Sequence, residues 1–186
     1  MTTLYVTKPI HRSPLRRALL LIAAALVIIA SLTAAPALAT PQSGVTSVTI
    51  AKGTFAAIEI FKRTDINSSV ATDFWQAVID TKGASDLYVV QNTVIPGGTF
   101  GWHSHPGPSL VIVVSGAATE YEGNDPTCTP HVHPAGSTFA DPGEASGHLV
   151  RNEGTVDLVV VVVRLVPEGF PQRIDLPNPG YCPNIN

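Results

Sequence analysis

Short apolar runs closed by turn residues fill the chain after residue 40, and this pattern constrains its fold more than any other feature. The runs are rich in Val, Ile, Thr and aromatic residues, and Gly, Pro, Asn or Asp ends each of them. Such punctuation is typical of the strands of an all-β sandwich or barrel. We predict strands at residues 45–51, 57–62, 86–95, 101–103, 109–115, 117–122, 137–140, 148–152 and 156–165.

One segment departs from this pattern. Val70, Phe74 and Val78 recur at the spacing of one helix face, and Ser68 and Ser69 precede them as candidate caps. We therefore predict one short helix within residues 69–79 that lies against the barrel wall.

The first 39 residues resemble an export signal rather than part of a soluble fold. Arg12, Arg16 and Arg17 form a basic lead, residues 18–32 are almost wholly apolar, and residues 37–39 are the Ala-Leu-Ala that signal peptidase accepts. The alternative is an uncleaved anchor, because the apolar stretch is about as long as the roughly 20 residues that span a bilayer. We expect a secreted, periplasmic or cell-envelope protein, with membrane anchoring by the uncleaved segment as the alternative.

Length and charge limit the remaining classes. At 186 residues the chain suits one main domain, and its formal net charge is −3. The leader holds four basic and no acidic residues, so its removal leaves a more negative protein that suits neither nucleic acid nor an anionic membrane surface. We divide the chain into a signal segment (1–39), N-terminal strands and helix packed on the barrel (40–85), the barrel (86–166) and a Pro-rich tail (167–186).

The two cysteines, Cys128 and Cys182, both follow the leader. An exported protein permits oxidation, so a disulfide between them is expected, and it would attach the tail to the barrel. A thiolate metal ligand is the alternative, although neither cysteine has a Cys-x-x-Cys partner.

Three histidines in the middle of the strand series carry the predicted chemistry. His103 and His105 are one residue apart, so on a strand both side chains project from the same face. His148 begins another predicted strand and can meet them if the sheet closes. Neutral imidazole is a common ligand of divalent metals, so these three residues predict a metal site.

At these residues the chain resembles the cupin family. Its first motif is matched by Gly97, His103, His105 and Gly116, and its second by Gly136, Pro142, His148 and Asn152 with one extra residue before the histidine. The match covers roughly residues 87–165. The resemblance implies a double-stranded β-helix, a jelly-roll-like barrel, around one divalent metal ion, and small cupins of this kind commonly form homodimers.

Two departures from the motifs affect the site. Ser109 stands where the first motif has a glutamate, so the metal is expected to lack its usual carboxylate ligand. Cupins with three histidines and no glutamate resemble the iron-dependent dioxygenases of the family, so the resemblance favours Fe(II) or Mn(II). Zn, Ni and Cu stay open, because three imidazoles suit all of these metals. The insertion at residues 144–146 places Glu144 near the barrel mouth, as a fourth ligand, a catalytic base or an exposed loop acid.

Further residues are weaker candidates. Phe100, Trp102 and Ser109 are expected to line a substrate cavity, with plain core packing as the alternative for the two aromatic residues. His131 and His133 share the one-residue spacing of the motif pair, but Pro130 and Pro134 bracket them, so we predict a loop rather than a second metal site.

Three functions remain open at this point. The first is a dioxygenase-like oxidoreductase in which the histidines hold the metal while a small molecule and oxygen take its open positions. The second is a non-catalytic module that binds a small ligand or a metal. The third is a metal-dependent isomerase, which would need an acid pointing into the cavity.

Overall fold

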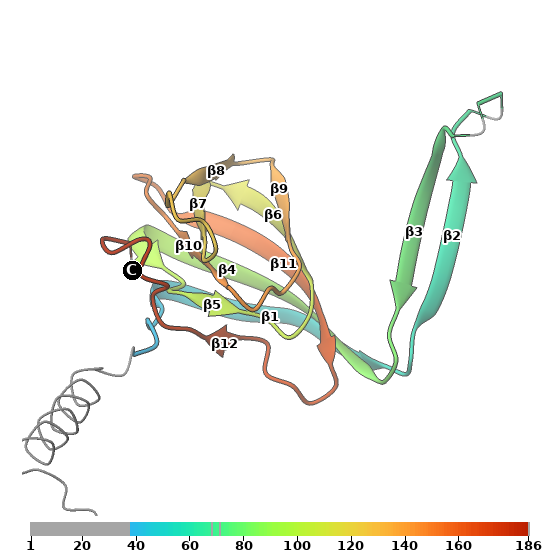
Figure 1. Cartoon of the computed structure of the whole chain (residues 1–186), viewed down its shortest axis with the longest axis horizontal. Helices are drawn as coiled ribbons and strands as arrows, with labels where there is room; N and C mark the ends of the chain where they lie inside the picture. Colours follow the sequence, from blue (N-terminus) through green and yellow to red (C-terminus); the bar gives the residue numbers. More distant parts are fainter. Residues whose placement is uncertain (1–37, 68, 71, 186) are drawn as a thin grey trace, which may run out of the picture. The chain divides into compact units, whose positions relative to one another are not determined.

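The long strand β4 (Ser85–Thr99) is the central element of a ten-stranded antiparallel sheet that curls into a nearly closed barrel (Figure 1). The computed structural model describes residues 38–67, 69–70 and 72–185. The predicted signal peptide falls almost wholly on residues 1–37, outside the described part. None of the described segments forms a helix of the length and apolarity that a membrane crossing needs.

The barrel strands follow one another along the main path of the sheet and its branches. Strand β4 pairs on one edge with β1 and on the other with β11, which in turn pairs with β6. The other barrel strands are β1 (Ser43–Phe55), β5 (His103–Ser104), β6 (Ser109–Ser115), β7 (Ala117–Glu122), β8 (His131–Pro134), β9 (Thr138–Asp141), β10 (His148–Arg151), β11 (Leu158–Pro167) and β12 (Ile174–Asp175).

The main core is built from interior-facing residues of several barrel strands, and β6 shows the alternation most clearly. In β6, Val111 and Val113 are buried while Leu110, Ile112 and Val114 between and beyond them are exposed. Successive side chains of a strand point to opposite faces, so every second residue faces the barrel interior. The buried cluster formed in this way consists of Val94, Val111, Val113, Ala118, Val150, Leu158, Val160 and Val162.

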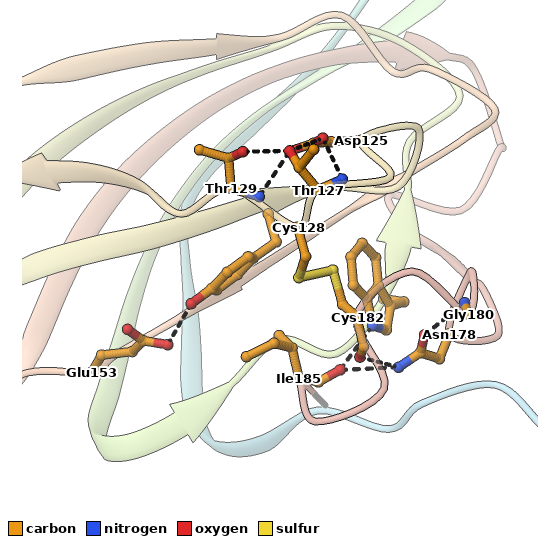
Figure 2. The surroundings of a disulfide bond; sticks show 11 residues. Asp125, Thr127, Cys128, Thr129, Glu153, Asn178, Gly180, Cys182 and Ile185 are labelled. Carbon is orange, nitrogen blue, oxygen red and sulfur yellow. Dashed lines mark hydrogen bonds between the residues drawn. A yellow bond between two sulfur atoms is a disulfide. The ribbon is translucent and has the colours of Figure 1, made fainter.

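A second cluster lies under the C-terminal tail. Trp102, Tyr121 and Leu149 pack there with Cys182, which forms a disulfide with Cys128 (Figure 2). The Trp102 indole Nε1 donates to the carbonyl oxygen of Ile185 at 3.1 Å. The tail is therefore attached to the barrel by a covalent bond, by burial and by hydrogen bonds.

The turn before the disulfide and the tail after it are both ordered by side-chain hydrogen bonds. Asp125 accepts from the backbone amides of Thr127 and Thr129 at 2.8 and 2.7 Å. In the tail, the Asn178 amide donates to the carbonyl oxygens of Cys182 and Ile185 (Figure 2). Both cysteines are thus held in place on either side of the bond.

The all-β barrel is confirmed, but the predicted helix is wrong. The described part of residues 69–79 instead contains a turn and most of strand β3 (Phe74–Asp80), which pairs with β2 (Glu59–Asp65) in a two-stranded sheet. The described residues contain no α-helix. Aromatic and β-branched residues occupy both strands, and they favour the pleated conformation over a helix.

The predicted loop at His131 and His133 is also wrong. Both residues lie in β8, which pairs with β7 so that Glu120 is opposite His131 and Ala118 is opposite His133. Pro130 directly precedes β8 and Pro134 is its last residue. Among the described strands β8 pairs with β7 alone, so it is an edge strand, where proline is tolerated.

Candidate metal centre

Three imidazole rings from two parts of the chain meet inside the barrel. His103 and His105 come from β5 and the residue after it, and His148 begins β10. The ring centroid of His103 lies 4.8 Å from that of His105 and 4.6 Å from that of His148. One ring nitrogen from each residue lies within 4.8 Å of the other two, and all three side chains are buried.

Strand pairing brings these residues together. His103 on β5 is directly opposite His148 on β10 in the antiparallel register. His105 follows two residues after His103 and projects into the same cavity, as the strand period requires. The three side chains therefore lie together on the interior face of the barrel, where the sequence predicted them.

Each ring is oriented through its Nδ1 atom. His103 Nδ1 donates to the carbonyl oxygen of Gly101 at 2.8 Å, and His105 Nδ1 donates to that of Gln172 at 2.6 Å. A carbonyl oxygen can only accept, so the proton of each neutral ring is on Nδ1. Both Nε2 atoms therefore carry a lone pair, which is the form that binds a metal. The lone pair of His105 Nε2 accepts from Arg164 Nη2 at 3.3 Å.

A carboxylate orients the third ring. Glu120 on β7 accepts from His148 Nδ1 at 2.7 Å and from His133 Nε2 at 3.0 Å. Burial alone would raise the pKa of Glu120, but the hydrogen bonds and the electrostatic attraction of His148 and His133 together lower it. Glu120 and His133 thus fix the orientation of His148 from behind, and they are not ligands in this arrangement.

Asp141, at the end of β9, faces the same point as the imidazoles. Its Oδ2 atom lies 3.3 Å from His105 Nε2 and 3.6 Å from His148 Nε2. Asp141 Oδ2 and His148 Nε2 are both buried and have no hydrogen-bond partner among the described residues. Such unsatisfied buried acceptors are costly unless a cation or proton lies between them.

The protonation of the rings agrees with a metal rather than a proton at this point. Burial, helped by His148 and Arg173, lowers the pKa of His103 well below its usual value. Burial and the Arg164 charge lower the pKa of His105 to about 3. Both rings are therefore neutral near pH 7, and the donor set of imidazole nitrogens with a nearby carboxylate fits one divalent ion.

The metal centre opens into a cavity of about 230 Å³ with mainly apolar walls. Its apolar lining residues are Val90, Phe100, Val111, Phe139, Val150, Val160 and Val162. Two cationic side chains, Arg164 and Arg173, reach the same space. The cavity thus combines apolar walls with the positive charges of Arg164 and Arg173 beside the histidines.

The two arginines differ in how well their donors are satisfied. Arg164 donates to Ser109 Oγ, to the carbonyl oxygen of Gln172 and, at 3.3 Å, to His105 Nε2. Burial lowers its pKa to about 10, so it stays charged near pH 7. Arg173 is paired with Asp175 through Nε, but its buried Nη1 and Nη2 atoms have no hydrogen-bond partner in the described part of the chain.

The weaker candidates from the sequence are placed as follows. Phe100 and Ser109 line the cavity, whereas Trp102 does not line it and is fully buried in the second core cluster. Trp102 is therefore a core residue, as the alternative prediction held, and its indole packs toward the C-terminal tail. Glu144 is an exposed loop residue that does not line the cavity, and it lines a second, more acidic pocket that shares Asp141 and His148 with the cavity.

Sequence reasoning missed Asp141, Arg164 and Arg173 as cavity residues. Asp141 precedes the motif residue Pro142, and Arg164 ends the Val-rich run of β11, so both had a visible local context. Arg173 lies in the tail, and only the return of the tail to β5 through β12 brings it to the cavity. No local pattern signals that return.

Comparison with known proteins gives matches among solved structures alone. No family model matches the chain, and no curated protein does. The chain is similar to cupin and double-stranded β-helix structures. A cupin-like protein from Thermotoga maritima is 22% identical, with a TM-score of 0.43, over 50% of this chain and 65% of that one.

Two further matches have the same character. A double-stranded β-helix protein from Klebsiella pneumoniae is 24% identical, with a TM-score of 0.39, over 48% of this chain and 75% of that one. An oxalate oxidase in complex with the substrate analogue glycolate is 25% identical, with a TM-score of 0.37, over 43% of this chain and 45% of that one. The matched region thus spans less than two thirds of the cupin-like protein and less than half of the oxidase.

Proposed function

We propose that this chain is a metal-dependent, dioxygenase-like oxidoreductase that acts on a small anionic molecule. The observation that carries the proposal is the set of three Nε2-facing imidazoles, His103, His105 and His148, at the wall of a cavity that also contains two arginines. Fe(II) or Mn(II) is the proposed ion. When bound, such an ion supplies a Lewis acid and a redox centre with open positions for substrate and oxygen.

The residues around the centre favour an anionic substrate. The Nη1 and Nη2 atoms of Arg173 are buried and unpartnered among the described residues, and they form a planar fork that matches a carboxylate. Arg164 lines the same cavity, with its Nη2 atom 3.3 Å from His105 Nε2. Because buried unpaired donors are unfavourable, a ligand that accepts from them gains affinity.

The cavity walls support water exclusion around such a ligand. Val150, Val160 and Val162 are buried and line the cavity, and Phe100 packs against the same cluster. An apolar wall strengthens every electrostatic interaction inside it, because the local dielectric is lower than in water. The volume of about 230 Å³ suits a small organic anion.

Oxygen consumption tests the proposal directly. The full chain is produced with its leader, purified, loaded with Fe(II), and supplied with a panel of small mono- and dicarboxylates under an oxygen electrode. We expect metal-dependent oxygen uptake with at least one of them, absent in His148→Ala and retained in Glu144→Gln. Tight carboxylate binding without oxygen uptake would overturn the oxidoreductase proposal and favour the binding module.

We also propose that the protein works outside the cytoplasm. The support is the basic and apolar leader and the Cys128–Cys182 disulfide, since disulfides persist mainly in oxidising compartments. Cell fractionation with N-terminal sequencing tests this, and a mature chain that begins at Thr40 is expected. Full-length protein recovered from the cytoplasm with reduced cysteines would contradict it.

A further inference from the structure

The motif position that lacks its glutamate has an acidic residue directly across the sheet. Ser109 on β6 is the register partner of Asp141 on β9 in the antiparallel pair. Directly opposite residues of such a pair point to the same face, so both side chains reach the cavity. The Ser109 hydroxyl accepts from Arg164 Nε at 2.9 Å. The carboxylate of this register pair is therefore supplied by Asp141 on β9.

Asp141 is placed to share an ion with two of the three imidazoles, those of His105 and His148. Two ligands that each lie 2.0–2.2 Å from one metal are about 2.8–3.6 Å apart at octahedral or tetrahedral angles. Asp141 Oδ2 is 3.3 Å from His105 Nε2 and 3.6 Å from His148 Nε2. Both distances fall in that range. The Nδ1 atoms of the two rings point away from this position, that of His105 to the Gln172 carbonyl oxygen and that of His148 to the Glu120 carboxylate.

The carboxylate of Asp141 is held in this orientation by its own turn. Its other oxygen, Oδ1, accepts from the Gly143 amide at 2.8 Å. Gly143 has a φ of +84°, and a Cβ atom there would lie 2.7 Å from the carbonyl oxygen of His105. The turn thus requires glycine, presses against the histidine segment and leaves Oδ2 as the free atom.

We propose that Asp141 is a fourth metal ligand, supplied from β9 in place of the motif glutamate of β6. The proposal rests on the metal centre proposed above and adds a ligand to it. One carboxylate with three neutral imidazoles compensates half of a divalent charge and leaves two octahedral positions for other ligands. The competing role for Asp141 is charge balance for the buried Arg164 guanidinium.

Metal binding to matched variants distinguishes these roles. Mn(II) affinity is measured by isothermal titration, and the Mn(II) electron paramagnetic resonance spectrum reports the ligand set. We expect Asp141→Asn to bind Mn(II) at least about 100-fold more weakly, the upper end of what loss of an outer-sphere partner costs. Glu144→Gln, which removes the exposed loop acid, should bind like the wild type.

A compensating variant keeps the test decisive if the single substitution harms folding. Ser109→Glu with Asp141→Ala returns the carboxylate to the motif position, and we expect its affinity to recover to within about tenfold of the wild type. Equal Mn(II) affinity of Asp141→Asn and wild type, with a less stable metal-free variant, would show charge balance and overturn the ligand assignment. Failure of the wild type itself to bind would instead refute the metal centre.

Discussion

Loss of the Cys128–Cys182 bond should cost about 4 kcal/mol of unfolding free energy. The two cysteines are 54 residues apart in sequence, and the chain-entropy model gives about that value for a loop of this length. Cys182 is 1% exposed and packs with Trp102, Tyr121 and Leu149, so the bond fixes the tail over the second core cluster. Replacement by alanine, Cys128→Ala with Cys182→Ala, removes the bond without burying a hydroxyl group.

Urea denaturation followed by tryptophan fluorescence measures this loss. Trp102 is fully buried under the tail and reports its release, whereas Trp75 is exposed on β3 and changes little. Wild-type protein treated with a reductant should match the double variant, which serves as the control for side-chain effects. A loss below about 1 kcal/mol would contradict this prediction, because it would mean that the bond does not restrict the unfolded chain.

Three further predictions follow from the same contacts. The free energy of unfolding of the metal-free protein should fall as the pH drops from 6.5 toward 3. Burial lowers the pKa of His103 and His105 in the folded protein, so the unfolded chain takes up protons first. A free energy of urea unfolding that stays constant across this range would contradict the prediction. Asn152→Ala should cost roughly 2–4 kcal/mol in the same assay, because the fully buried Asn152 side chain loses three hydrogen bonds, with Val94, Val156 and Gly154. Arg173→Gln should weaken carboxylate binding about tenfold in equilibrium dialysis, because it removes the charge and the planar fork of buried donors. Equal carboxylate binding would contradict this.

The barrel strands could be predicted from sequence because core burial and turn residues mark them. Residues 109–115 and 117–122 were predicted with the bounds that the structure has. The first strand alternates as a half-buried strand does, whereas residues 118–121 of the second are all buried, so its bounds follow from the flanking turn residues. Strand β3 was missed for the opposite reason. Phe74, Trp75, Val78 and Ile79 are all exposed, so no core selects between the helical and the pleated period, and β propensity with pairing to β2 decides.

The candidate site was predictable only where its residues share a motif. His103, His105 and His148 stand at motif spacings, and strand geometry then places them on one face. Asp141 could not be assigned in the same way. Its position opposite Ser109 depends on the pairing of β6 with β9, and strand register between distant segments is set by tertiary packing rather than by local sequence.

Anomalous X-ray diffraction from crystals of the mature protein grown with Mn(II) would locate the ion. We predict one anomalous peak per chain, about 2.0–2.2 Å from the Nε2 atoms of His103, His105 and His148. A protein that binds no Mn(II) at these three nitrogens, with the peak absent or at another site, would contradict the account.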